Sequence, residues 1–112
     1  MVKVNCKENV WFKFISYEFL VAAQVAYGVY ALQSLVPTVT SAADGIHGEG
    51  SLHPDGLAWD FRIWGLYDVR SVAEEICIKL QEIDYRYDVV FGDPKHLDHI
   101  HIEYDINKVK TV

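Results

Sequence analysis

The amino-acid sequence predicts a single α+β domain in which helices flank an antiparallel sheet. One long apolar segment and one segment with apolar residues at helical spacing predict helices, whereas in two others apolar and polar residues alternate as in half-buried strands. The chain has 112 residues, enough for one hydrophobic core but too few for two. Its composition, 51% hydrophobic and 23% charged, is typical of a globular domain. We therefore expect residues 1–112 to form one domain.

The first helix is predicted over about Val10–Ser34 and ends before Pro37, because proline cannot continue a helix. The segment Phe14–Val36 is apolar enough to raise the question of a membrane span. Glu18 and Gln24 lie inside it, and a charge within a span is costly. Acidic residues also interrupt the basic start that a secretory signal peptide requires. We expect a buried helix, no clear signal peptide and no membrane partner.

The rest of the chain is predicted to contain strands, one further helix and connecting loops. Residues 42–56 hold four of the seven glycines and show no regular period, which indicates a loop. Asp68 is a candidate N-cap for the second helix, in which apolar residues recur at helical spacing as far as Ile83. The expected strands are 37–41, Leu57–Trp64, Tyr85–Phe91 and His99–Tyr104.

Charge and cysteine content exclude some classes of function. The net charge is −6 and no basic run occurs, so nucleic acid is not an expected partner. Cys6 and Cys77 lie far apart and have no metal-binding spacing. They could pair in an oxidising compartment, but Cys77 falls in the pattern of an amphipathic helix. This favours a reduced thiol in the core.

Two of the strands carry metal-binding residue types on one face. Alternation places Trp59 and Phe61 on one side of their strand and Asp60 on the other. In the last strand, His99 and His101 share the face opposite the isoleucines. If both strands belong to one antiparallel sheet, these three polar side chains converge on its open face. Imidazole nitrogen and carboxylate oxygen are ligands of Zn²⁺, which favours a zinc site there.

The residues around this site resemble those of a known enzyme family. "SLHPDGLAWD" resembles the SxHxxGxAxD motif of the M15 family of zinc D-Ala-D-Ala carboxypeptidases and related peptidoglycan peptidases. The fixed positions are Ser51, His53, Gly56, Ala58 and Asp60. "DHIHIEYD" resembles the family's closing strand, in which an acidic residue precedes a ligand histidine by three positions. The resemblance covers about residues 37–105 and implies the hedgehog/DD-peptidase fold, which the amino-terminal domain of hedgehog proteins shares.

The resemblance also implies roles for individual residues. His53, Asp60 and His101 would hold one zinc ion per chain, and Asp98 would be the general base. Asp98 and His101 would point to opposite faces of a regular strand, so Asp98 must lie at a bend or a strand start. His99 has the parity of the site and is expected to contact the substrate or a ligand.

The serine of the motif and the two remaining histidines are not expected to take part in catalysis. Ser51 is expected to support the loop or a ligand by hydrogen bonding, since no base is spaced to activate it as a nucleophile. His47 and His96 are interpreted as surface or packed residues.

One departure from the family concerns substrate binding. Many members follow "TS" with Gly-Tyr-Arg, whose arginine binds a substrate carboxylate, but here the stretch reads "TSAADGIHG". Arg62 lies on the strand face of Asp60 and could bind that carboxylate instead, because guanidinium pairs well with carboxylates. Arg62 could equally be an exposed residue or an ion-pair partner of Asp60.

The resemblance implies a zinc-dependent peptidase that cuts the peptidoglycan stem peptide. It would act either as an endolysin-like endopeptidase or as a D-Ala-D-Ala carboxypeptidase. The alternative is a non-catalytic zinc-binding or partner-binding domain of the hedgehog-like fold. If phage-encoded, the protein would stay in the cytoplasm until release and then act on the cell wall, and a monomer is favoured.

Overall fold

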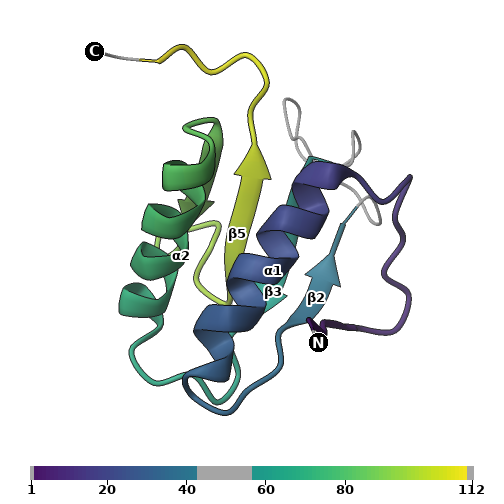
Figure 1. Cartoon of the computed structure of the whole chain (residues 1–112). Coiled ribbons are helices and arrows are strands. Elements are labelled where there is room, and N and C mark those ends of the chain that lie inside the picture. Colours follow the sequence, from purple (N-terminus) through teal and green to yellow (C-terminus); the bar gives the residue numbers. More distant parts are fainter. Residues whose placement is uncertain (1, 43–56, 111–112) are drawn as a thin grey trace.

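The structure, a computed structural model, describes residues 2–42 and 57–110 and has an α+β fold (Figure 1). Two helices pack on a mixed sheet of five strands. In chain order the elements are β1 (Asn5–Cys6), α1 (Tyr17–Ala31), β2 (Thr38–Ser41), β3 (Ala58–Arg62), α2 (Val69–Ile83), β4 (Tyr87–Val90) and β5 (His99–Tyr104). Most of the predicted loop, including Ser51, His53 and Gly56, lies outside the described residues.

The strands are ordered β1-β2-β3-β5-β4, and three of the four neighbouring pairs are antiparallel as predicted. The expectation of a purely antiparallel sheet is wrong at one edge, because β1 pairs with β2 in parallel. The chain leaves β1, forms α1 and then returns to the sheet, and such a crossover makes neighbouring strands parallel. The Asn5 and Lys7 amides donate to the carbonyls of Pro37 and Val39, both at 2.8 Å.

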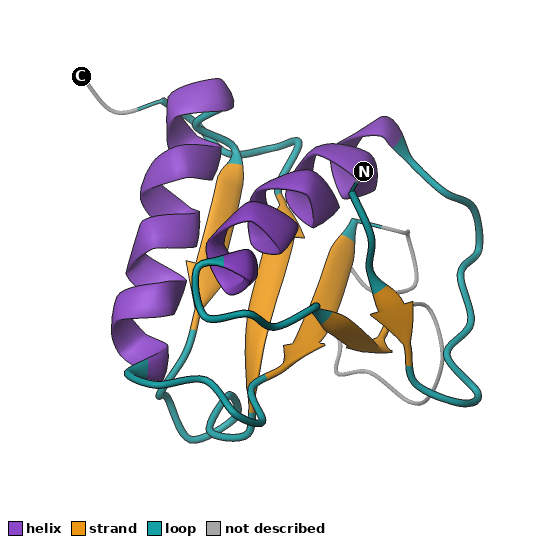
Figure 2. Ribbon diagram, turned by 60° about the horizontal axis from the view of Figure 1, so that its bottom comes forward, coloured by secondary structure: helices purple, strands orange, loops and turns teal. Residues whose placement is uncertain are grey.

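Both helices cover the same face of the sheet (Figures 1 and 2). The predicted alternation is confirmed, because Trp59, Phe61, Ile100 and Ile102 are fully buried in one core with residues of α1 and α2. Among the described residues, the opposite face carries no helix. We call it the open face, and Asp60 and the β5 histidines project onto it.

The first helix is shorter than predicted at both ends. Ser16 has an extended backbone and its hydroxyl accepts a hydrogen bond from the Phe19 amide at 3.0 Å, so α1 begins at Tyr17. At the other end Ser34 has a φ of 60°, which the helix cannot accommodate. The second helix follows the prediction, since the Asp68 carboxylate caps it by accepting from the Ser71 amide at 3.3 Å.

Among the described residues, no helix has both the length and the apolar character that a membrane crossing needs.

The two cysteines belong to opposite edges of the sheet. Cys6 lies on β1, whereas Cys77 on α2 lies beside Val89 of β4. Four strand spacings separate these edges, about 19 Å in all, which excludes a disulfide between them within one chain. Both thiols are free, but Cys77 is partly exposed rather than a core residue as predicted.

Candidate metal site

The register of β3 against β5 builds the site. Asp60 pairs with His101, and Arg62 pairs with His99. Directly opposite residues of an antiparallel pair have Cβ atoms only about 5 Å apart, so their side chains meet on the same face. The structure therefore brings together Asp60, His99 and His101 as the alternation predicted.

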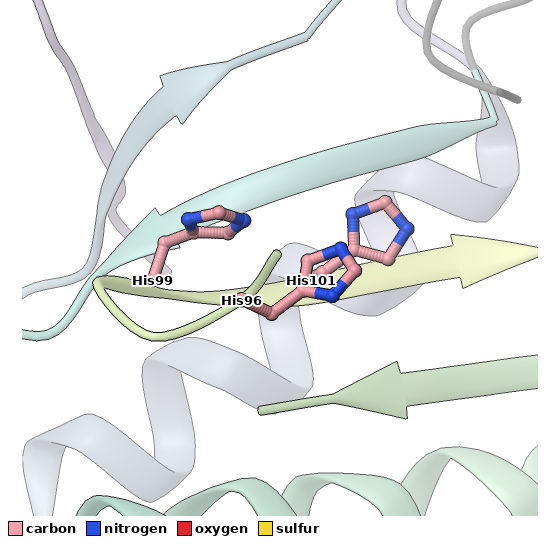
Figure 3. Close-up of side chains that lie close together, drawn as sticks. All are labelled: His96, His99 and His101. Carbon is pink, nitrogen blue, oxygen red and sulfur yellow. The ribbon is translucent and has the colours of Figure 1, made fainter. Parts of the chain in front are cut away.

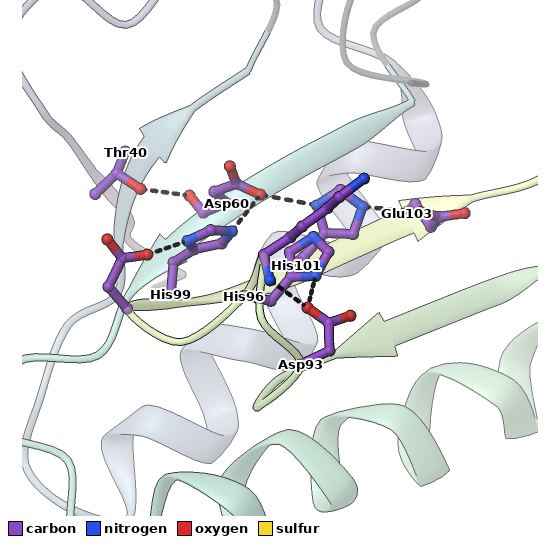
Figure 4. Close-up of polar contacts among 9 residues, drawn as sticks. Thr40, Asp60, Asp93, His96, His99, His101 and Glu103 are labelled. Atoms are coloured by element: carbon purple, nitrogen blue, oxygen red, sulfur yellow. Dashed lines mark hydrogen bonds and ion pairs between the residues drawn. The ribbon is translucent and has the colours of Figure 1, made fainter. Parts of the chain in front are cut away.

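His101 lies between two carboxylates (Figure 4). Its Nδ1 donates to Asp60 Oδ1 and its Nε2 donates to Glu103 Oε1, each at 2.8 Å. The residue is only 8% exposed. Burial alone would lower the pKa of His101, but the hydrogen bonds and charges of Asp60 and Glu103 outweigh it and raise this pKa to about 9. Without a metal ion, His101 is therefore a buried cation at neutral pH.

His99 reaches the same carboxylate from the neighbouring position. Its Nε2 lies 3.5 Å from Asp60 Oδ1, and its Nδ1 donates to Asp98 Oδ1 at 2.6 Å. Asp98 lies at a bend directly before β5. This is the position that the sequence analysis required if Asp98 and His101 are to serve one site. The Asp98 side chain is 92% exposed, so solvent reaches the carboxylate while it holds the His99 ring.

The turn before β5 adds a third histidine that the sequence interpretation left outside the site. The His96 ring lies 5.2 Å from that of His99 and 4.9 Å from that of His101, measured between ring centroids (Figure 3). Two backbone hydrogen bonds hold the turn, from Gly92 to the His96 carbonyl at 2.7 Å and from His96 to the Asp93 carbonyl at 3.0 Å. His96 is thus not a solitary surface residue.

Gly92 is needed where this turn starts. Its φ of 94° lies in the left-handed region that favours glycine, and a Cβ at this position would come within 2.5 Å of the Arg70 guanidinium.

We call His96, His99 and His101 the histidine trio. One ring nitrogen of each lies within 4.8 Å of the others, so the trio could hold a metal ion. The signal in the sequence was the close spacing of the three histidines along H-x-x-H-x-H. It was missed because residues in a turn follow no period that assigns them to a face.

A cavity of about 280 Å³ adjoins the site and contains cationic side chains. We call it the Arg62 cavity, and its lining residues are Lys7, Thr40, Arg62, Trp64, Asp98 and His99. The Arg62 guanidinium lies 3.8 Å above the ring of Trp64, a side chain that is 72% exposed. Within residues 2–42 and 57–110, neither Lys7 nor Arg62 forms an ion pair. The alternative of an Arg62–Asp60 ion pair is therefore wrong.

The described residues thus gather five of the predicted site residues around one region: Asp60, Arg62, Asp98, His99 and His101. The predicted zinc ligand His53, the supporting residue Ser51 and His47 lie outside the described residues. No family model, no curated protein sequence and no solved structure matches this chain.

Proposed function

We propose that this chain is a zinc-dependent peptidase that hydrolyses a peptide bond in the stem peptide of peptidoglycan. The observation that carries the proposal is the approach of Asp60 Oδ1 to His101 Nδ1, 2.8 Å apart across β3 and β5. The resemblance to the zinc D-Ala-D-Ala carboxypeptidases adds His53 as the third ligand, seven positions before Asp60.

The residues present fit a zinc ion. Carboxylate oxygen and imidazole nitrogen are zinc ligands, and catalytic sites use three protein ligands. Histidines that bind a metal usually donate their second ring nitrogen to a carboxylate, and His101 makes this contact with Glu103. Zinc would supply Lewis acidity to polarise the scissile carbonyl and make water acidic at neutral pH.

The proposal gives Asp98 the role of proton carrier. A carboxylate that is exposed beside the cavity can take a proton from the attacking water and deliver it to the leaving amine. Its bond to His99 Nδ1 fixes the orientation of both side chains. His99 Nε2 lies near Asp60 on the open face, and in the imidazolium form, with both ring nitrogens protonated, it would donate a hydrogen bond to the developing oxyanion of the substrate.

Arg62 and Lys7 are proposed to bind a substrate carboxylate. Both cations line the same cavity and neither has an ion-pair partner among the described residues. Arg62 follows Asp60 by two positions, which is about 7 Å along a strand. This separation suits a carboxylate on the residue that follows the cleaved bond. A terminal D-Ala residue and a D-Glu linked through its side chain both carry one.

The proposal is tested by incubating zinc-loaded protein with purified muropeptides and identifying the products by mass spectrometry. Loss of a terminal D-Ala residue identifies a carboxypeptidase, and separation of L-Ala from D-Glu identifies an endopeptidase. The Asp60→Ala variant is the matched control and should release neither product. Intact muropeptides after incubation with zinc-loaded protein would overturn the proposal and favour a non-catalytic zinc-binding or partner-binding domain.

A further inference from the structure

Each histidine of the trio is held by a carboxylate of its own (Figure 4). His96 Nδ1 donates to Asp93 Oδ1 at 2.7 Å, and His99 Nδ1 donates to Asp98 Oδ1 at 2.6 Å. For His101 the ring is reversed, and Nε2 donates to Glu103 Oε1 at 2.8 Å. His96 and His99 thus each keep one ring nitrogen outside these bonds, whereas the other nitrogen of His101 donates to Asp60 and would have to lose its proton to bind a metal.

One ring nitrogen of each histidine lies within 4.8 Å of those of the other two. The nitrogens outside the bonds named above are Nε2 of His96, Nε2 of His99 and Nδ1 of His101. The last two lie 3.5 and 2.8 Å from the same oxygen of Asp60. A carboxylate that accepts the N–H of one ring nitrogen fixes the tautomer and leaves the other nitrogen as a ligand, which is the usual pattern around metal-binding histidines. Three neighbouring histidines that each donate to a carboxylate are not expected from surface residues without a shared role.

The chain builds this arrangement locally. Asp93 and His96 belong to one turn, closed by the backbone bond between them and by the Lys95 amide, which donates to the Asp93 carboxylate at 2.9 Å. His99 and His101 follow at the start of β5, whose core face is fixed by fully buried isoleucines. These contacts hold the trio from within the residues that the structure describes.

We infer that His96, His99 and His101 form a metal-binding site of their own, which holds a divalent transition-metal ion without a ligand from residues 43–56. Imidazole ligands suit Zn²⁺, Cu²⁺, Ni²⁺ and related ions, whereas Ca²⁺ and Mg²⁺ prefer oxygen. Asp60 is the neighbouring oxygen donor. The site shares His101 with the proposed catalytic set, so the two sets of ligands compete for one ion. It does not depend on hydrolytic activity.

The test is a Co²⁺ titration of the metal-free protein, followed by its visible absorption and by calorimetry. The His53→Ala variant should still bind about one ion per chain. His96→Ala and His99→Ala should each weaken binding at least tenfold, and His101→Ala should abolish it. His47→Ala is the matched control and should bind as the unmodified chain does. Retained binding in both His96→Ala and His99→Ala, together with loss in His53→Ala, would overturn the inference.

A second variant distinguishes the loss of a metal ligand from unfolding of the histidine variants. Asp93→Asn removes the carboxylate partner of His96 without removing a ligand, and the loss of such a partner weakens metal binding by about 10- to 100-fold. Nitrogen chemical shifts of the imidazole rings, recorded with and without Zn²⁺, provide an independent readout. They should change for the trio in the otherwise unmodified chain and in His53→Ala. Unchanged shifts at His96 and His99 would contradict the site.

The outcomes separate this inference from the proposed function. If the trio variants lose metal while zinc-loaded protein leaves muropeptides intact, the metal site stands and the peptidase proposal fails. If muropeptides are cleaved but only His53, Asp60 and His101 matter for metal binding, the peptidase proposal stands and the trio fails.

Discussion

Asp60 and His101 are register partners on β3 and β5, and a partly buried hydrogen bond of 2.8 Å joins His101 Nδ1 to Asp60 Oδ1. Because the same imidazole also donates to Glu103, the metal-free fold holds His101 as a cation between two carboxylates. The same ring would have to give up its Nδ1 proton to bind a metal. Protons and metal ions therefore compete at this residue.

The metal-free protein is expected to lose stability as the pH rises. The pKa of His101 is about 9 in the folded chain, above its ordinary value of 6.5. The stabilisation from the protonated His101 is fully present below pH 6.5 and is lost as the pH rises through about 9, on the order of 3 kcal/mol. Urea unfolding at pH 6 and pH 9.5, with chelator present, measures this loss. Asp60→Asn should reduce the difference between the two pH values, and an undiminished difference would contradict the assignment to His101.

Metal binding should show the opposite dependence on pH. Below pH 9 a bound ion must displace one proton from His101, so the affinity for Zn²⁺ should rise about tenfold for each pH unit between pH 6 and 8. Calorimetry in buffers of different ionisation enthalpy counts the released protons. An affinity that is constant over this range would show that His101 is not a ligand. Chelation of the metal should leave the fold intact below pH 6.5, since the protonated pair then holds the strands.

Asp98→Asn should separate metal binding from catalysis. The amide keeps the shape of the side chain but cannot carry the proton, so we expect a fall in kcat of about 10²- to 10⁴-fold on muropeptides. Zinc content should stay near one ion per chain when zinc is in large excess, although the loss of the carboxylate partner of His99 weakens binding to the trio. The measurements are product formation by mass spectrometry and metal analysis of the same sample. An unchanged kcat would remove Asp98 from the mechanism.

Arg62→Ala should weaken the binding of substrates that carry a free carboxylate after the scissile bond. We expect kcat/KM to fall about 10- to 100-fold for these substrates and to change little for the corresponding amides, because only the former lose a charged partner. Arg70→Ala is the matched control, since Arg70 also lies over an aromatic ring, Phe91, but lines a different cavity. Equal losses for acid and amide substrates would show that Arg62 acts only on the fold.

The sequence predicted those parts of the fold in which a side-chain pattern and local capping agree. Strict alternation predicts the bounds of β5 and the sheet face onto which Asp60 projects. The helical periodicity and the Asp68 cap predict α2. The first residue of α1 could not be predicted, because its N-cap Ser16 lies inside an apolar run. β1 has no pattern at all, and only its hydrogen bonds to the segment around β2 define it.

The candidate site was predictable only where strands carry it. Asp60, His99 and His101 converge because β3 and β5 are neighbours, which alternation could anticipate. His96 could not be placed, since its position depends on the turn closed between Asp93 and His96 and on the unusual φ of Gly92. Lys7 could not be placed from the sequence either, because the parallel pairing of two distant segments brings it to the Arg62 cavity.

The short strand β1 makes the amino-terminal segment a wall of the Arg62 cavity. Asn5 and Cys6 bury no side chain in the core, so their pairing with the segment around β2 adds little to the stability of the domain. It does fix Lys7 beside Arg62. Under the proposed function, a fused tag or a trimmed end would therefore change which substrates the Arg62 cavity accepts before it changed the core.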